Sequence, residues 1–419
     1  MKRFSILLAS TLFTLTSALA NNVYYNSNYV DYVAAVKTMN HDKTGKFAIP
    51  NQSEAPDTYE PYYIWHYGRH GSRYHYSQKD YQYILEQFAH ADSTKNLTSF
   101  GKEVYEDIKK ICRNAEMRAG DLTPRGVAQH KGIAKRMYAN YQNVLLNDAK
   151  IEVKSSTSVR CILSMNAFVT ELLANNPNLK INVDASKKYM DYVCFGGTVG
   201  NGEKVKNLES FYAKREYKGD MFKRIFENGK VENESEFVRV IYYMVISLQG
   251  VDVEDMDERH CSLMQLFTEE EMAQQWQKQN IYWYKDVAWG NKQASKLIKK
   301  MLEDCESAED KGLSANLMFG HDTGLLPLVS LMNLDGAGNA YDDAETLHEK
   351  WQDYRIIPMA GNLQIIFFKS KARDVKNPTL VKFLLNEREV TLPIKEYSGV
   401  FYEWDKVKEY LNKIVEDCK

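Results

Sequence analysis

The chain has 419 residues, which is long enough for one large or two medium domains with a sizeable core. Hydrophobic residues make up 44% and charged residues 26%, as in an ordinary globular protein. The formal net charge of −2 excludes a general nucleic-acid-binding protein, so any attraction for a polyanion must come from a local basic pocket.

The first twenty residues have the pattern of a secretory signal. Lys2 and Arg3 form a charged region, residues 4–16 form an apolar one, and Ala-Leu-Ala at 18–20 is a small-x-small cleavage site. The apolar run is short and rich in serine and threonine, which favours a cleaved signal over a membrane anchor. We expect cleavage after Ala20 and a secreted or periplasmic mature protein with no membrane segment.

Strand-like runs then alternate with helical ones. We expect strands at 62–67, 151–156, 315–320, 362–369 and 379–386, and helices at about 101–118, 124–147, 159–175 and 402–416. This alternation predicts an α/β fold with a mostly parallel sheet flanked by helices. The block from about 185 to 308 is mainly helical, and with a helix near 78–92 it is expected to form a lid. The predicted domains are a core of 21–75, 100–184 and 309–419 and a helical lid of 76–99 and 185–308.

The most informative segment is Arg-His-Gly-Ser-Arg at 69–73, directly after the first predicted strand. Arg69 and Arg73 bracket the imidazole of His70, and Gly71 lets a bulky anion approach the backbone. The arginines can neutralise a phosphate group while the imidazole supplies a nucleophile. The segment therefore fits attack on a phosphoryl group by a histidine, against the alternative of a chance cluster on a solvated loop.

Two later segments supply what the first one lacks. Arg160 lies in the first turn of the helix predicted at 159–175, where free backbone N–H groups favour anions. His321 and Asp322 follow the buried strand predicted at 315–320, at the strand end where open α/β sheets usually bind ligands. The three segments together, in this order, predict a phosphatase site.

These motifs resemble those of the histidine acid phosphatase family. Within it, the chain is similar to the secreted branch that holds phytases, glucose-1-phosphatases and multiple inositol-polyphosphate phosphatases. Asp-Leu-Thr-Pro-Arg-Gly at 121–126 matches another recurrent element, and it has the pattern of a helix start with Thr123 as N-cap. The strand at 362–368 resembles the family's closing core strand. The resemblance covers residues from about 60 to 395 and implies a phosphoglycerate-mutase-like core with a helical insertion domain.

The resemblance also implies a role for each site residue. His70 would form a phosphohistidine, and Asp322 would protonate the leaving oxygen and then act as base during hydrolysis. The phosphate would be held by three arginines and the second histidine, namely Arg69, Arg73, Arg160 and His321. An alkoxide is a poor leaving group, so a general acid contributes roughly a hundredfold to ten-thousandfold. The guanidiniums can stabilise the transition state without a metal, so no metal or other cofactor is expected.

Two positions depart from the family pattern. The family often has proline two residues after the second motif arginine, where this chain has Tyr74-His75. The inositol-polyphosphate members usually place their acid as glutamate in His-Ala-Glu, where this chain has Thr323. Asp322 instead fills the acid position of the His-Asp phytases.

Side chains outside these motifs give weaker indications of function. The six cysteines lie far apart with no Cys-x-x-Cys pair, which disfavours zinc. Export permits disulfides, and both disulfides and buried free thiols stay open. Cys161 is expected to pack in the core, and His66 is expected to be a packed residue beneath the site rather than a ligand.

We therefore expect an exported, metal-independent histidine phosphatase that acts on small-molecule phosphomonoesters. Inositol polyphosphates such as phytate are the leading substrates by resemblance, with a sugar-phosphate or broad-specificity acid phosphatase as the alternative. A non-catalytic phosphate-ligand binding protein is the rival outside enzymes, but binding alone does not require an acid beside the second histidine. No nucleic-acid partner is expected, and the oligomeric state stays open. Because Asp322 must be protonated, the pH optimum is expected at roughly 4–6.

Overall fold

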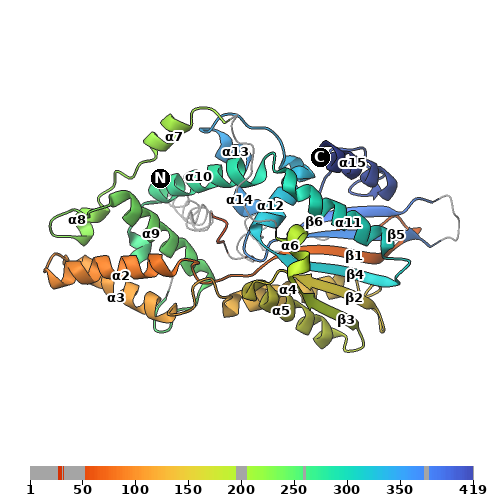
Figure 1. The fold of residues 1–419 in the computed structure, drawn as a ribbon, viewed down its shortest axis with the longest axis horizontal. Helices are drawn as coiled ribbons and strands as arrows, with labels where there is room; N and C mark the ends of the chain where they lie inside the picture. Colours follow the sequence, from red (N-terminus) through yellow and green to blue (C-terminus); the bar gives the residue numbers. More distant parts are fainter. Residues whose placement is uncertain are drawn as a thin grey trace, which may run out of the picture.

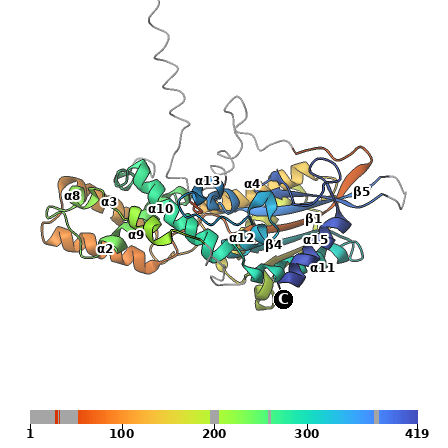
Figure 2. The same ribbon diagram turned by 90° about the horizontal axis from the view of Figure 1, so that it is seen from above.

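The computed structural model describes residues 27–30, 32, 52–194, 205–257, 261–371 and 377–418. The expected signal segment and its cleavage site lie outside the described residues. Figures 1 and 2 show a part built on a β-sheet and, beside it, a part made of helices.

The sheet is centred on strand β1 (Tyr59–Arg69). The strand order is β3-β2-β4-β1-β5-β6-β7, with β8 paired to β6. The other strands are β2 (Lys150–Ser155), β3 (Lys180–Ala185), β4 (Leu313–Gly320), β5 (Asn362–Ser370), β6 (Leu380–Leu385), β7 (Arg388–Val390) and β8 (Tyr402–Glu403). Strands β1 to β4 pair in parallel, whereas β5 to β8 join through antiparallel pairs. The predicted α/β class, with a central sheet flanked by helices, is confirmed. The predicted mostly parallel pairing holds for β1 to β4 only, because β5 to β8 join through antiparallel pairs and the sheet is mixed.

Strand β1 takes the central position because both of its faces are apolar. Tyr63, Trp65 and Tyr67 are fully buried on one face, and Ile64 is fully buried on the other. Successive side chains of a strand point to opposite faces, so both faces of such a run must be covered by other parts of the protein. The strand ends at Arg69 and thereby places the Arg-His-Gly-Ser-Arg motif at the edge of the sheet.

Helices cover both faces of the sheet. One face is covered by α4 (Pro124–Asn140) and α5 (Val159–Asn175), and the other by α11 (Ser295–Ser307), α12 (Asp322–Leu331) and α15 (Trp404–Asp417). The predicted start of α4 is confirmed, because the Thr123 side chain accepts a hydrogen bond from the N–H of Gly126 and Pro124 is the first helical residue. The start and end predicted for α5 agree with the structure, whereas α4 ends earlier than predicted.

The helical part has a hydrophobic core of its own. It is formed by α2 (Gln78–Ser93), α3 (Ser99–Asn114), α8 (Met221–Ile225) and α9 (Glu234–Ser247). Helix α10 (Glu269–Tyr282) reaches from this core to the sheet, because Met272 packs in the first and Ile281 in the second. The shorter helices are α6 (Met190–Val193), α7 (Leu208–Lys214), α13 (Leu347–Lys350) and α14 (Asp353–Ile356).

The packing does not follow two of the predicted domain boundaries. Helix α3 was expected in the α/β core, but its buried side chains pack in the helical part. Helix α11 was expected in the lid, but it packs against the sheet. An amphipathic pattern shows which face of a helix is buried and does not show which neighbour covers it, so the sequence could not assign either helix.

Two further findings concern the whole described chain. Each of the six cysteines is a free thiol, and Cys161 is buried as expected. Among the helices that the structure describes, none has both the length and the apolar character needed to cross a membrane.

Candidate active site

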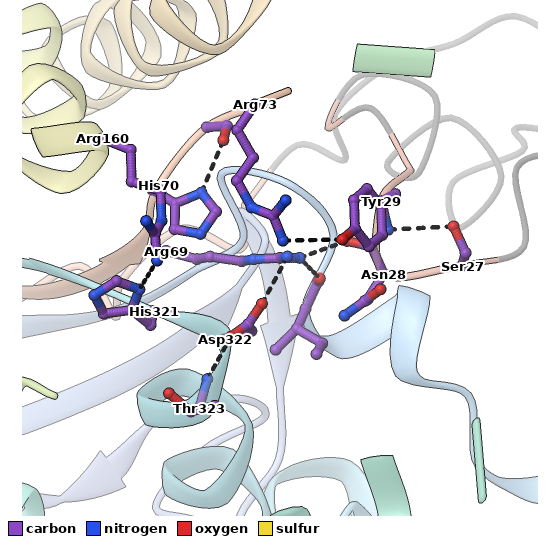
Figure 3. A network of polar contacts seen from close by, with 12 residues as sticks. Ser27, Asn28, Tyr29, Arg69, His70, Arg73, Arg160, His321, Asp322 and Thr323 are labelled. Carbon is purple, nitrogen blue, oxygen red and sulfur yellow. Dashed lines mark hydrogen bonds and ion pairs between the residues drawn. The ribbon is translucent and has the colours of Figure 1, made fainter. Parts of the chain in front are cut away.

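The six residues predicted to form the site come together at the carboxyl ends of the central parallel strands (Figure 3). His70 directly follows β1, and His321 directly follows β4. The N–H of His70 donates to the carbonyl oxygen of Gly320 at 3.0 Å, which holds the two strand ends together. The ring centroids of His70 and His321 are 5.6 Å apart. Strand pairing therefore sets the spacing between the two imidazoles.

His70 is buried, and its ring orientation is fixed by the backbone. Its Nδ1 lies 2.9 Å from the carbonyl oxygen of Gly71. A carbonyl oxygen can only accept, so Nδ1 carries the proton and Nε2 carries the free lone pair. Burial and the positive charges of Arg69 and Arg160 hold the pKa of His70 well below its ordinary value of 6.5. His70 is therefore a neutral imidazole with an available nucleophilic nitrogen.

Arg69 is fully buried and is held on several sides. Its Nη2 forms an ion pair with Oδ2 of Asp322 at 2.7 Å. Its Nη1 donates to the carbonyl oxygens of Asn28 and Ile357. Its Nε has no hydrogen-bond partner among the described residues. The guanidinium is thus fixed in direction and keeps one donor group for a further acceptor.

Asp322 is the first residue of α12, where the helix dipole favours a negative charge. Its Oδ1 accepts a hydrogen bond from the N–H of Thr323 at 2.8 Å. Burial raises the pKa of this carboxyl, but the positive charges of Arg69 and Arg73 outweigh burial and lower it below the ordinary 3.8. The free site therefore holds a carboxylate. A phosphate dianion that engages the arginines would offset their charge and raise the pKa of Asp322.

Arg73 lies against aromatic rings. Its Nη2 donates to the hydroxyl of Tyr29 at 3.0 Å, and its guanidinium carbon is 4.8 Å from the centroid of the Tyr29 ring. The ring of Tyr76 lies 5.6 Å from the same carbon. Cation–π contacts of this kind hold a guanidinium in one plane and leave its edge available to an anion.

Arg160 and His321 form a pair on the opposite side of His70. Arg160 Nη2 lies 3.3 Å from His321 Nδ1, and Ser156 Oγ lies 3.1 Å from His321 Nε2. A guanidinium can only donate, so Nδ1 accepts and Nε2 carries the proton. Burial and the charge of Arg160 lower the pKa of His321 from 6.5 to about 4. The Cys161 thiol lies 3.5 Å from the same Nε2, so it packs directly under the site.

Sequence reasoning missed the residues that surround this set. Asn28 and Tyr29 contact Arg69 and Arg73, although about forty residues of chain separate them. Ser156 lies in a segment that the sequence singled out, but only Arg160 was assigned a role there. The contacts of Asn28 and Ile357 are made by backbone carbonyl groups, which every residue has. No side-chain pattern could have revealed them.

Comparison with known proteins decides the family. Residues 68–386 match the histidine phosphatase superfamily (branch 2). The chain belongs to this superfamily. The predicted resemblance and the predicted enzyme class, a phosphoric monoester hydrolase, are confirmed at this level.

Individual relatives agree with the family. Human multiple inositol polyphosphate phosphatase 1 is 29% identical over 126 residues, which span 29% of this chain and 26% of the human protein. The Gallus gallus protein of the same name is 21% identical over 334 residues, or 71% of this chain and 70% of that relative. The human match thus spans about a quarter of that relative's length.

Solved structures share the fold. The apo form of a multiple inositol polyphosphate phosphatase from Bifidobacterium longum has a TM-score of 0.70 and 18% identity, covering 93% of this chain and 97% of that one. The phytase from D. castellii has a TM-score of 0.65 and 15% identity, covering 94% and 84%. These similarities extend over the sheet and the helical part together.

Proposed function

We propose that this protein hydrolyses phosphomonoesters through a phosphohistidine intermediate formed on His70. The observation that carries the proposal is the state of the imidazole, which is neutral, buried, fixed through Nδ1 and surrounded by three arginines. A neutral Nε2 is a nucleophile, and the arginines attract the dianion that it attacks. The same group on an open loop would have neither property.

In the first step, the lone pair of Nε2 attacks phosphorus while the bond from phosphorus to the ester oxygen breaks. The ester oxygen takes a proton from Asp322, which the bound dianion has allowed to protonate. In the second step, water attacks the phosphohistidine and gives its proton to the Asp322 carboxylate. The nitrogen–phosphorus bond breaks, inorganic phosphate forms and both side chains return to their starting states.

The cationic groups stabilise the charge that develops on the transferred phosphoryl group. The proposed clamp consists of Arg69, Arg73 and Arg160. His321 joins it as a further donor when the bound dianion raises its pKa and Nδ1 takes up a proton. Groups held in place before the reaction need no reorganisation during it, and a single such donor contributes about 10² to 10³ in rate. The ion pair and carbonyl contacts of Arg69 and the aromatic contacts of Arg73 provide that pre-organisation.

Inositol polyphosphates are the substrates we propose. The relatives named above are inositol polyphosphate phosphatases and a phytase, and one solved relative from Bifidobacterium longum is complexed with inositol hexasulfate. In this chain, Lys278 is half-buried on α10 and has no ion pair among the described residues. Tyr282, one helical turn later, lies within electrostatic reach of Asp322. A multiply phosphorylated ring brings further phosphates that would pair with such a cation.

Export is also part of the proposal, supported by the signal pattern of residues 1–20. N-terminal sequencing of protein from the periplasmic and extracellular fractions tests it. A chain that begins at Asn21 supports cleavage after Ala20, and recovery of the uncleaved chain in the cytoplasm only would contradict it.

The catalytic proposal is tested by phosphate release at pH 5 with EDTA present, from phytate and from glucose 1-phosphate. We expect release from phytate by the wild type, none by His70→Ala, and retained activity in His66→Phe, which changes another buried histidine of the same segment. Release from glucose 1-phosphate alone would assign the enzyme to sugar phosphates. Phosphate binding without release from either ester would favour a binding protein, and loss of activity with EDTA would contradict the metal-free mechanism.

A further inference from the structure

The loop after Arg73 connects the phosphate-binding segment to the helical part. Backbone hydrogen bonds secure one side of it. The N–H of Tyr74 donates to the carbonyl oxygen of Asp121 at 3.0 Å. The N–H of Gly120 donates to the carbonyl oxygen of His75 at 3.1 Å. The other side of the loop is held by a side chain.

That side chain is His75, whose imidazole is fully buried. Its Nε2 lies 2.8 Å from Oδ2 of Asp80 in α2. Both oxygens of Asp80 also accept hydrogen bonds from Arg239 in α9, at 3.0 and 3.1 Å. One carboxylate thus joins the loop to two helices of the helical part.

The protonation states follow from these contacts. Burial lowers the pKa of His75 below 6.5, although the hydrogen bond to Asp80 opposes this. Burial opposes ionisation of Asp80, but its bonds to His75 and Arg239 dominate and lower its pKa. Neutral His75 therefore donates from Nε2 to a carboxylate. Its buried Nδ1 has no hydrogen-bond partner among the described residues, and a buried nitrogen left unpaired opposes folding. Stability alone does not explain a histidine at this position.

Contacts between aromatic rings connect His75 to Arg73. The His75 ring centroid is 4.7 Å from that of Tyr76 and 5.5 Å from that of Tyr243. Tyr76 in turn lies beside the guanidinium of Arg73, at 5.6 Å. A shift of the imidazole would displace Tyr76 and, with it, one wall of the space that Arg73 occupies.

We infer that His75, Asp80 and Arg239 form a positioning triad through which the helical part holds Arg73 in place for the substrate's phosphate. His75 touches no substrate, so it is a positioning residue that acts through Arg73. The inference rests on the proposed function, because it assigns Arg73 to the phosphate. It adds that the helical part contributes to the geometry at the reacting phosphate.

The test measures the affinity for inorganic phosphate by titration calorimetry, with KM and kcat for phytate alongside. His75→Phe keeps an aromatic ring among the tyrosines but cannot bond to Asp80, and we expect it to weaken phosphate binding about tenfold. His75→Gln restores an N–H near the Nε2 position and should recover most of that loss. Glu236→Gln is the matched control, because Glu236 pairs with Arg239 at 2.7 Å without contacting His75. It should bind phosphate as the wild type does.

A double-mutant cycle decides whether His75 acts through Arg73. In an Arg73→Lys background, His75→Phe should weaken phosphate binding less than about twofold, because effects that share one path are not additive. Equal losses in both backgrounds, or a lower melting temperature with unchanged phosphate affinity, would overturn the inference. If His75→Phe does not fold, Asp80→Asn replaces it with the same expectation. A wild type that binds phosphate but hydrolyses no ester would refute the proposed function and leave this comparison intact.

Discussion

His66 is buried beneath the site. It provides a quantitative test of how burial changes the pKa of a histidine and, through it, the free energy of unfolding. Its ring lies in β1 between Phe168 and Phe319, with both centroids at 5.3 Å. Burial, with a smaller contribution from His130, lowers the pKa of His66 from 6.5 to about 3. Between these values the unfolded chain binds a proton that the folded protein does not. The free energy of unfolding therefore rises with pH across that window and falls as the pH drops through it.

The magnitude follows from the two pKa values. With 6.5 for the unfolded chain and about 3 for the fold, His66 costs about 2 kcal/mol of stability at pH 5 and almost nothing at pH 8. At pH 5, any folded pKa below about 4 gives nearly the same cost, because the titration of the unfolded chain sets it. His66→Phe removes the titrating group and keeps an aromatic ring between the two phenylalanines.

Urea unfolding of wild type and His66→Phe at pH 5 and pH 8 measures this effect. Any packing cost of the larger ring is present at both pH values and cancels in the comparison. We expect the variant to gain about 2 kcal/mol relative to the wild type on going from pH 8 to pH 5. An equal difference in stability at both pH values would show that folded His66 accepts a proton in this range, which would refute the argument from burial.

Two further predictions concern the chemistry and the packing of the site. Asp322→Asn should slow phosphohistidine formation from phytate by about 10² to 10⁴ in single-turnover measurements, and formation from p-nitrophenyl phosphate much less, because nitrophenolate leaves without a proton. Equal losses in this first step would show that Asp322 is not the acid, whereas loss of its role as base slows the second step equally for both substrates. Gly126→Ala should cost about 1–3 kcal/mol in urea unfolding, since its Cβ would lie 2.4 Å from the carbonyl oxygen of Ser72. Gly132→Ala in the same helix meets only Nη1 of Arg136 at 3.1 Å, although the guanidinium is held by Glu387 at 2.7 Å, and should change stability by less than about 1 kcal/mol in either direction; similar losses in both variants would contradict the packing argument.

The site was predictable because its side chains lie at or directly after the ends of regular elements. Strand β1 ends at Arg69, strand β4 ends at Gly320, and Arg160 is the second residue of α5. Each of these elements has an apolar pattern that a sequence displays. Parallel strands then bring their carboxyl ends together, so residues far apart in the chain were expected at one edge.

The parts that were missed depend on contacts without a local signature. Strands β7 and β8 are three and two residues long and exist only through their pairing with β6. The antiparallel half of the sheet follows from tertiary pairing, because β5 has the same apolar pattern in either direction. Nothing in the residues around Tyr29 shows that they pack against Arg73. The place of α3 in the helical part likewise depends on its partners rather than on its own periodicity.

The position of β1 has a consequence for synthesis of the chain. This strand pairs with β4 on one side and β5 on the other, and both partners are encoded more than 240 residues later. A ribosome therefore releases a strand with four tyrosines, one isoleucine and one tryptophan long before either neighbour exists. Non-local pairing slows folding, and an unpaired apolar strand invites aggregation. Yield during recombinant production should consequently respond more to chaperone supply and to a lower temperature of expression than to substitutions on the protein's surface.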